Sequence, residues 1–293
     1  MHILTLDIEE WALEKAKIGG GDIQRFIHFD EMLERTLDLL KTNHLHATCF
    51  CTGKMAEEFP HIIRKIAEQN HEIACHSHLH QWCNKMTKED FENDTYIAVD
   101  TIEQCIGKKI LGYRAPAFSI TEKTPYAFET LSKNGIIYDA SVFPMQRDFG
   151  GFPSFGSAVP SRIRYNDTEI LEFPIPTARI FGKDIAWSGG GYFRLIPYPM
   201  ISYWQKQSNY TMSYFHLNDL IQASWNMMSK ERYEEYFKEP GTLKNRILRM
   251  VKGNISIGNT FNKLSKFITA GEFITIQTAI KKIDWANTPI IQL

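Results

Sequence analysis

Residues 72–80 read Glu-Ile-Ala-Cys-His-Ser-His-Leu-His, which places three histidines directly after a short apolar strand. Imidazole suits zinc and related transition ions, and ligands that are close in sequence need little chain ordering to form a site. The first apolar run, residues 2–7, brings two acidic residues, Asp7 and Glu9, to its C-terminal end. Two histidines and one carboxylate form a typical catalytic metal triad with a position left for water. The pattern predicts a metal-dependent hydrolase.

Apolar runs alternate with helical patterns through the first three quarters of the chain. The runs expected to form strands are 2–7, 47–52, 72–76, 110–114, 136–140, 170–175 and 211–216. The segments with helical periodicity are 30–42, 55–69, 89–106 and 124–134. Asp30 is the expected N-cap of its helix, and Tyr96 is expected on the apolar face of 89–106. Repeated strand–helix units predict a parallel α/β fold, and about seven units predict a closed or nearly closed barrel.

The rest of the chain follows other patterns. Residues 145–200 are rich in Gly, Pro and aromatic residues and are expected to form an irregular lid or binding loop. Residues after about 225 are richer in Lys and Glu and are expected to be mostly helical. We therefore expect one domain over 1–293, with a core at about 1–220 and a helical extension at about 221–293.

Composition limits the class of protein and its partners. The 293 residues carry a net charge of −1, which gives no electrostatic case for nucleic acid as a partner. The chain opens on a core strand without the basic and apolar regions of a signal peptide, and it lacks a run of about 18 apolar residues. A cytoplasmic location is expected. Five scattered cysteines suit a reducing compartment, and Cys49 and Cys51 are expected to be small buried residues.

Polar residues of catalytic type follow five of the expected strands. In parallel α/β barrels functional side chains collect at the C-terminal ends of strands, so these residues are expected to converge. They are Asp7 and Glu9, His76 and His80, Arg114-Ala-Pro116, Asp139-Ala-Ser141, and His216.

These motifs, in this order, resemble those of the polysaccharide deacetylase family, the NodB-homology carbohydrate esterases. The resemblance rests on Thr5-Leu-Asp7-Ile-Glu9, His76-Ser-His78-Leu-His80, Arg114-Ala-Pro116 and Tyr214-Phe-His216-Leu217, and it covers about residues 3–220. Gly189-Gly-Gly-Tyr-Phe-Arg-Leu-Ile-Pro197 also resembles a stretch found in a bacterial subgroup linked to exopolysaccharide and O-antigen synthesis. The family implies a deformed (β/α)7 barrel.

The resemblance also implies roles for single residues. Glu9, His76 and His80 would hold a divalent metal, with Zn²⁺ first and Co²⁺, Ni²⁺ or Fe²⁺ as alternatives. Asp7, paired with Arg114, would be the general base, and His216 the general acid that protonates the departing amine. The metal and a backbone N–H near Ala117 would stabilise the oxyanion. The implied reaction removes an N-acetyl group from an amino sugar of a bacterial polysaccharide or its precursor.

Several assignments stay open at this point. Glu10 is a rival to Glu9, and a pairing of His76 with His78 competes with the pairing to His80. The residue that orients His216 is Asp139 or Asp219, with Asp139 preferred. The expected substrate contacts are Pro116, Ala117, Tyr192 and Trp187, although packing is the favoured interpretation of the aromatic residues Tyr192, Phe193 and Trp187.

Function also has alternatives. The same fold and metal would suit another C–N bond, as in a formamide, a cyclic imide or a ureide. A non-catalytic glycan-binding relative is disfavoured, because Asp7 and His216 are both present. The basic groups at 244–252 and 263–266 are expected to be a solvated helix face, with peripheral contact to an anionic membrane as the alternative. The sequence leaves the oligomeric state open.

Overall fold

The structure is a computed structural model that describes residues 1–9, 23–147, 150–180, 182–220, 227–237, 239–254 and 257–293. Its main sheet has the strand order β10-β1-β2-β3-β4-β5-β7-β6-β12, and β11 also pairs with β1. The bounds are β1 (His2–Ile8), β2 (Thr48–Cys51), β3 (Glu72–Cys75), β4 (Gly112–Tyr113), β5 (Tyr138–Asp139), β6 (Ser161–Tyr165), β7 (Thr168–Glu172), β10 (Thr211–His216), β11 (Phe273–Ile274) and β12 (Ile290–Gln292). All pairs in this sheet are parallel except β6 with β7.

Each of the seven expected strands overlaps one observed strand, and these seven are neighbours in the order β10, β1 to β5 and β7. The α/β prediction is therefore confirmed. Among the described strands, β7 takes β6 as its second neighbour instead of β10, so hydrogen bonds do not close the ring between β7 and β10. The parallel strands nevertheless bring their C-terminal ends to one edge, where the polar motifs lie.

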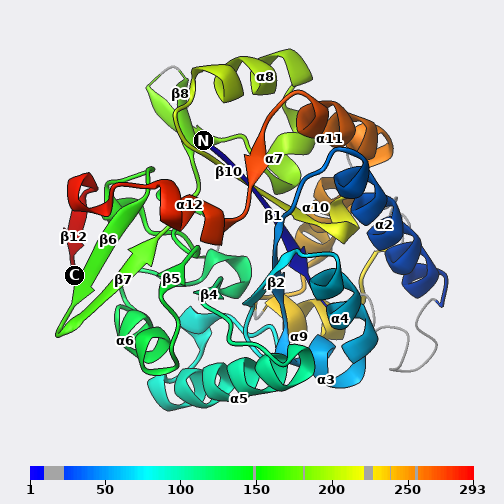
Figure 1. Ribbon diagram of the computed structural model, residues 1–293. Helices are drawn as coiled ribbons and strands as arrows, with labels where there is room; N and C mark the ends of the chain where they lie inside the picture. Colours follow the sequence, from blue (N-terminus) through cyan, green and yellow to red (C-terminus); the bar gives the residue numbers. More distant parts are fainter. Residues whose placement is uncertain (10–22, 148–149, 181, 221–226, 238, 255–256) are drawn as a thin grey trace.

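Five helices of the first half lie around the outside of β1 to β5 (Figure 1). They are α2 (Ile23–Thr42), α3 (Gly53–Glu58), α4 (Pro60–Glu68), α5 (Lys88–Ile106) and α6 (Tyr126–Lys133). The expected helix at 55–69 is divided, because Pro60 has no N–H to continue α3 and instead starts α4. The N-cap prediction for Asp30 is wrong, since α2 already begins at Ile23. Tyr96 is also misassigned, since it is 62% exposed while Asp94 is buried.

The expectation of irregular structure holds for the described residues of 145–160, which contain only the 3₁₀ turn Pro153–Phe155, but it is wrong for 161–200. β6 and β7 form an antiparallel hairpin, and β8 (Thr177–Ile180) forms a second hairpin with β9 (Lys183–Ala186). Two helices follow, α7 (Gly190–Leu195) and α8 (Tyr198–Gln207). The Gly and Pro residues that suggested irregular structure mostly mark the ends of these short elements.

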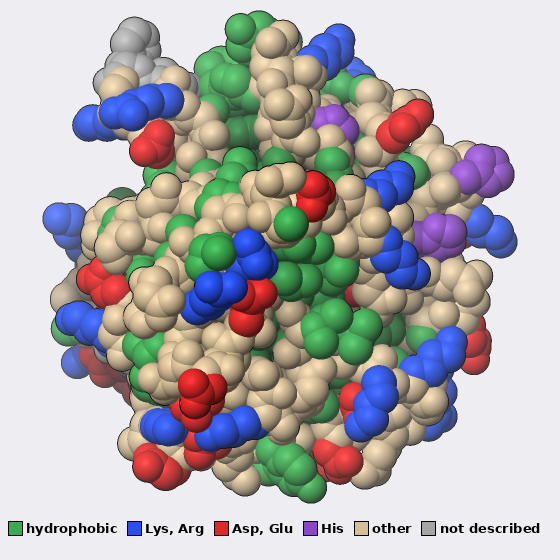
Figure 2. All heavy atoms as spheres, turned by 60° about the vertical axis from the view of Figure 1, so that its left-hand side comes forward, with side chains coloured by type: hydrophobic (Ala, Val, Ile, Leu, Met, Phe, Trp, Pro, Cys, Tyr) green, Lys and Arg blue, Asp and Glu red, His purple; other side chains and the backbone are tan. Residues whose placement is uncertain are grey.

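The C-terminal part contains the helices α9 (Lys230–Phe237), α10 (Leu243–Asn254), α11 (Thr260–Thr269) and α12 (Ile276–Lys282). It also returns to the main sheet twice, because β11 pairs with β1 and β12 pairs with β6. Within the described ranges, every helix is too short or too polar to cross a bilayer. On the face drawn in Figure 2, Lys and Arg side chains are interspersed with Asp and Glu.

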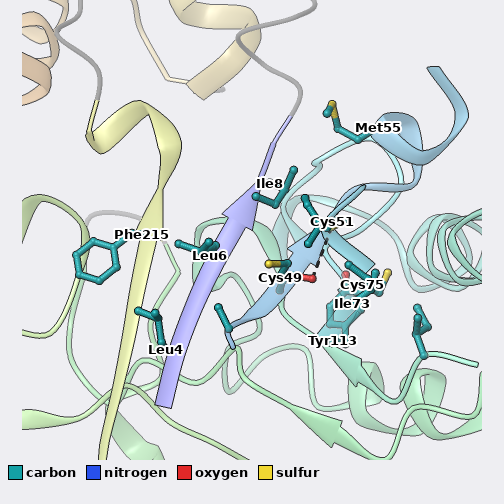
Figure 3. Packing of buried hydrophobic residues seen from close by; sticks show 14 of the residues in the cluster. Leu4, Leu6, Ile8, Cys49, Cys51, Met55, Ile73, Cys75, Tyr113 and Phe215 are labelled. Atoms are coloured by element: carbon teal, nitrogen blue, oxygen red, sulfur yellow. Dashed lines mark hydrogen bonds between the residues drawn. The ribbon is translucent and has the colours of Figure 1, made fainter. Parts of the chain in front are cut away.

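The core lies between the strands and the helices, and β1 shows how it orients the site. Leu4, Leu6 and Ile8 are buried in one apolar cluster with Cys49, Cys51 and Phe215 (Figure 3). Burial raises the pKa of the Cys49 and Cys51 thiols, which are buried as expected. Successive side chains of a strand point to opposite faces, so the residues between these apolar ones face the other way. Thr5 and Asp7 are therefore directed away from this cluster, with Glu9 following in the same alternation.

Candidate active site

Asp7 and Glu9 share one face of β1 because a single residue, Ile8, separates them. Asp7 is 2% exposed and Glu9 7% exposed. Adjacent acids would point to opposite faces of a strand, so the Asp-x-Glu spacing is what brings both carboxylates to one place. The rival ligand Glu10 lies outside the described residues.

The loop after β3 brings His76 and His80 to Glu9. Nε2 of His76 lies 3.4 Å from Oε1 of Glu9, and Nε2 of His80 lies 3.1 Å from the same oxygen. Nδ1 of His76 lies 2.7 Å from the backbone carbonyl of Arg114. A carbonyl only accepts, so Nδ1 carries the proton and Nε2 presents its lone pair to Glu9.

The backbone of this loop is held in an uncommon conformation. Ser77 has a φ of 68° and His80 a φ of 56°, in the left-handed region that non-glycine residues rarely adopt. Residues in such regions persist only where surrounding contacts hold them, and they cluster at functional sites. Asp94 of α5 supplies part of this hold, since its carboxylate accepts from the backbone N–H groups of His78 (2.8 Å) and Leu79 (3.1 Å).

His78 does not join the cluster. Its ring lies against Gly53 of α3, where an added Cβ would stand 2.5 Å from Nδ1 of His78. The structure therefore brings His80, and not His78, to His76 and Glu9. Asp94 was missed in the sequence, although it follows Phe91 by three residues and so shares its buried helical face.

Arg114 connects the first and third motifs from inside the barrel. Its side chain is fully buried, and Nη1 donates to Oδ1 of Asp7 (2.7 Å) and to Oγ1 of Thr5 (2.8 Å). Nε donates to the carbonyl of Ala140 (3.2 Å), and the guanidinium stacks 4.1 Å from the ring centroid of Phe50. Asp7 is thus held in one orientation by a buried cation, as expected from the sequence.

His216, the last residue of β10, completes the cluster. Its Nε2 lies 3.2 Å from Oε1 of Glu9 and 3.5 Å from Oδ2 of Asp7, and its Nδ1 lies 2.9 Å from Oδ2 of Asp219. Nε of Arg194 lies 3.8 Å from Oδ1 of Asp219. The preference for Asp139 as the partner of His216 is therefore wrong. The partner is Asp219, because the turn after β10 folds back within three residues.

Charges in the cluster shift the proton affinities. Burial alone would lower the pKa of His216, but the carboxylates of Glu9 and Asp219 outweigh it and raise this pKa well above its ordinary value. Burial alone would raise the pKa of Glu9, but His80 and His216 lower it well below its usual range. The protonated imidazole of His216 is therefore favoured beside ionised Glu9.

Asp139 has a different position, behind the third motif. Its carboxylate accepts from the backbone N–H (3.0 Å) and the hydroxyl (2.6 Å) of Ser141, whose Oγ in turn accepts from the N–H of Ala115 (2.7 Å). Asp139 and Glu172 are both fully buried. Burial raises the pKa of each, and the charge of Asp139 raises that of Glu172 further. This pair supports the turn that carries Arg114.

The expected substrate contacts have unequal positions. Trp187 is 1% exposed and packs against Trp204, so the expectation of a sugar contact is wrong for it. Pro116 is buried and shapes a turn in which Ala117 has a φ of 55°. Ala117 is partly exposed, and Tyr192 is half-buried with its ring 6.2 Å from that of Phe143.

A neighbouring cation was missed in the sequence. Nη1 of Arg147 donates to the carbonyl of Ala117 (3.2 Å), and its guanidinium lies 4.3 Å from the ring centroid of Phe143. Only its place inside the aromatic-rich stretch after the fifth strand could have indicated this. Arg147 thus holds the turn at Ala117, whereas Ser141 and Asp139 hold it at Ala115.

The donor set fits a divalent metal ion. The ligand atoms of Glu9, His76 and His80 lie within 4.8 Å of one another, as do those of Asp7, Glu9 and His216. Nε2 of His76 is buried and has no hydrogen-bond partner among the described residues. An aimed, unpartnered imidazole lone pair beside a buried carboxylate is the arrangement expected of a metal site. The trio with two imidazoles suits Zn²⁺ and neighbouring transition ions best.

Comparisons with known proteins agree with this geometry. A family model described as polysaccharide deacetylase matches residues 22–136, and a model of a domain of unknown function, DUF3473, matches residues 140–281. The region 22–136 belongs to the polysaccharide deacetylase family. The deacetylase model includes His76, His80 and Arg114, whereas Asp7, Glu9 and His216 lie outside it. The structure brings the site residues inside the matched region together with those outside it.

Curated relatives match over part of their length. A peptidoglycan deacetylase of Helicobacter pylori is 33% identical over 149 residues, which is 49% of each chain. A peptidoglycan-N-acetylglucosamine deacetylase of Bacillus cereus is 29% identical over 92 residues, 31% of this chain and 34% of the relative. The chain thus spans about half or less of the curated relatives that it matches.

Solved structures of deacetylase type share the fold. A crystal structure described as that of a polysaccharide deacetylase from Mycobacterium smegmatis has a TM-score of 0.64 at 16% identity, covering 100% of this chain and 92% of that one. A carbohydrate esterase family 4 pseudoenzyme from Bacillus anthracis has a TM-score of 0.50 at 11% identity, covering 100% of this chain and 69% of that one. At these identities the likeness shows a shared fold.

Proposed function

We propose that this deacetylase-family protein is a metal-dependent hydrolase that removes an N-acetyl group from an amino sugar of a bacterial polysaccharide or its precursor. The observation that carries the proposal is the convergence on one oxygen, Oε1 of Glu9, of His76, His80 and His216 at 3.1 to 3.4 Å. Asp7 lies beside this cluster and is held by an ion pair with Arg114. A pseudoenzyme would be expected to lack at least one of these groups.

Glu9, His76 and His80 would hold the ion. A divalent ion there supplies Lewis acidity, which lowers the pKa of water and polarises an amide carbonyl. Zn²⁺ is the proposed ion, with Co²⁺, Ni²⁺ or Fe²⁺ as alternatives. Arg114 serves this site through its backbone, since its carbonyl fixes the tautomer of His76.

Two protein groups move protons in the proposed reaction. Asp7 takes the proton of the attacking water, and its orientation is fixed by the bond from Arg114. His216 then donates a proton to the amine that leaves the sugar, and the carboxylate of Asp219 beside its Nδ1 stabilises the imidazolium. The products are acetate and a free amino group.

The substrate is proposed from chemistry and relatives together. The relatives named above are peptidoglycan deacetylases, which makes an N-acetylated amino sugar the first candidate. Ala117 would place a backbone N–H near the developing oxyanion, and Tyr192 would contact a sugar ring. The link to exopolysaccharide or O-antigen synthesis and the cytoplasmic location stay predictions from the sequence.

The test is a deacetylation assay on the full chain. We would strip metal with a chelator, restore one ion at a time, and incubate with N-acetylglucosamine oligomers, measuring acetate and free amine. Formamides, cyclic imides and ureides run in parallel to test the alternative. Asp7→Asn is the inactive control, because it should keep bound metal but lose turnover. Release from an amide of another class alone would move the activity to that class, and no release from any compound would refute a hydrolase.

A further inference from the structure

The outer face of α10, which we define as Leu243, Lys244, Ile247 and Leu248, is unusual for a surface helix. Leu243 is 58% exposed, Ile247 40% and Leu248 45%. These residues recur at helical spacing, so they form one continuous apolar stripe. A surface helix of a globular protein normally turns such a stripe to the core.

Two arginines of α10, Arg246 and Arg249, lie on its inner side instead. Nη1 of Arg246 donates to the carbonyl of Met228 (3.1 Å), and the guanidinium of Arg249 stacks 4.4 Å from the ring centroid of Phe237 in α9. Thr242 fixes the start of the helix, since its Oγ1 accepts from the N–H of Asn245 (3.2 Å). Contacts with Met228 and with Phe237 of α9 therefore hold the two arginines on the inner side, and the apolar stripe is left exposed.

The charge around this face indicates which partner. Residues 241–271 contain no Asp or Glu in a chain whose net charge is −1. Of the six basic residues in this stretch, Lys244, Lys252 and Lys266 are exposed. Arg246 and Arg249 lie on the inner side of α10, and Lys263 donates to three backbone carbonyls. A purely apolar protein partner would not require this bias, whereas an anionic surface would be attracted by it.

We propose that α10 docks the protein onto an anionic lipid surface, with its apolar stripe in the headgroup region. Interfacial helices combine an apolar face with Lys and Arg and bind by apolar burial together with attraction to anionic lipids. The described helices offer no membrane span, so this contact is peripheral.

The C-terminal end of α10, beyond the docking face, is connected to the candidate active site through Arg194. Nη2 of Arg194 donates to the carbonyl of Lys252 (3.0 Å), and the same guanidinium lies beside Asp219, the partner of His216. A glycan attached to or lying on a lipid surface would therefore be presented close to the catalytic cluster. The docking itself does not depend on any catalytic activity.

Vesicle binding of the full chain tests the proposal. The protein is mixed with sucrose-loaded vesicles of phosphatidylcholine, either alone or with about 30% phosphatidylglycerol. The bound fraction is measured by sedimentation at ~0.05 and ~0.5 M salt, because the screening length is much shorter at the higher concentration. We expect binding to the anionic vesicles that falls with salt. Ile247→Glu should lower the partition coefficient at least about tenfold, and Lys244→Gln about fivefold.

Matched controls keep the test specific. Tyr96→Glu replaces an exposed aromatic residue on α5, and Lys108→Gln replaces an exposed lysine elsewhere; both should bind as wild type. Circular dichroism shows that each variant folds. Equal binding by Ile247→Glu and wild type, or no binding to anionic vesicles, overturns the proposal. A dimer that Ile247→Glu dissociates, without vesicle binding, would instead assign the face to a second copy.

Discussion

Oδ2 of Asp219 lies 2.9 Å from Nδ1 of His216, three residues earlier in the chain. The same aspartate also accepts from the backbone N–H of His216 (3.3 Å), so the turn holds both the ring and its own backbone. This contact directs Nε2 of His216 toward Asp7 and Glu9.

Asp219→Asn should therefore lower kcat by about 10- to 100-fold, the effect typical of removing a partner that orients a functional histidine. The physical reason is that an amide neither fixes the tautomer nor stabilises the imidazolium. His216→Ala should lose about 10²- to 10⁴-fold, the contribution of general acid catalysis. Acetate release measures both. Asp284→Asn, at an exposed 3₁₀-helix N-cap, is the control. Unchanged kcat in Asp219→Asn would contradict the assignment.

Metal content should distinguish His80 from His78, although both belong to one motif. His80→Ala removes a proposed ligand and should lower the affinity for Zn²⁺ well over tenfold. His78→Ala should keep full metal content, because the His78 ring lies against Gly53 instead of Glu9. Elemental analysis after dialysis against a buffered zinc solution provides the measurement. Loss of metal in His78→Ala with retention in His80→Ala would exchange the two roles.

The pair of Asp7 and Arg114 should dominate the stability of the barrel interior. Arg114→Met leaves Asp7 as a buried charge without its cation and should lower the free energy of unfolding by about 3–5 kcal/mol. Adding Asp7→Asn removes that charge, so the double variant should be less destabilised than the sum of the singles. Urea denaturation of the metal-free protein gives all four values. Strict additivity would show that the two groups do not interact.

The buried acids Asp139 and Glu172 predict a dependence of stability on pH. The folded-state pKa of Glu172 is raised, so its stabilising contribution is complete below the unfolded pKa of about 4.3 and is lost as the pH rises through the folded value. Glu172→Gln mimics the protonated acid and keeps an oxygen for the N–H of Val142. Relative to wild type, this variant should gain stability as the pH rises from ~5, by up to about 1.4 kcal/mol per pH unit.

Urea unfolding of the two proteins between pH ~5 and ~8 measures this difference, and other titrating groups cancel in the comparison. Glu169→Gln, on the same strand but partly exposed, serves as the control and should show no such trend. A difference between Glu172→Gln and wild type that stays constant with pH would contradict the raised pKa.

Two neighbouring glycines should respond in opposite ways to alanine. A Cβ on Gly189 would stand 2.1 Å from the backbone oxygen of Tyr214, which precedes His216 on β10 and has no room to move. Gly189→Ala should therefore destabilise the protein and reduce activity. On Gly191 a Cβ would meet only Nη2 of Arg194 at 3.5 Å, an ordinary contact, and alanine favours the helix by up to about 1 kcal/mol. Thermal melting compares them, and equal melting temperatures would refute the clash.

Strand positions were predictable because each lies in a compact apolar run, and the polar residues at strand ends were predictable because parallel strands share one edge. The meeting of Asp7 with Glu9 was predictable because side chains two residues apart share one face of a strand. The meeting of His76 with His80 was predictable because both belong to one short loop. The partner of His216 could not be predicted, because two aspartates satisfied the sequence equally and only the turn after β10 distinguishes them. Trp187 shows a second limit, since an aromatic residue in a Gly-rich stretch is equally compatible with burial and with sugar binding.

Two of the strands that pair with β1 are synthesised long after it. The strand pairs with residues 211–216 along one edge and, at His2 and Ile3, with residues 273–274 along the other, and both partners lie more than 200 positions away. At ~5–20 residues per second, a ribosome needs roughly 10–40 s to supply them. During that interval Asp7 and Glu9 stand on a strand with an unpaired edge, and the nascent chain cannot assemble its reaction centre. Maturation of the catalytic cluster is therefore an event of late or completed translation, when chaperone protection of this edge would matter most.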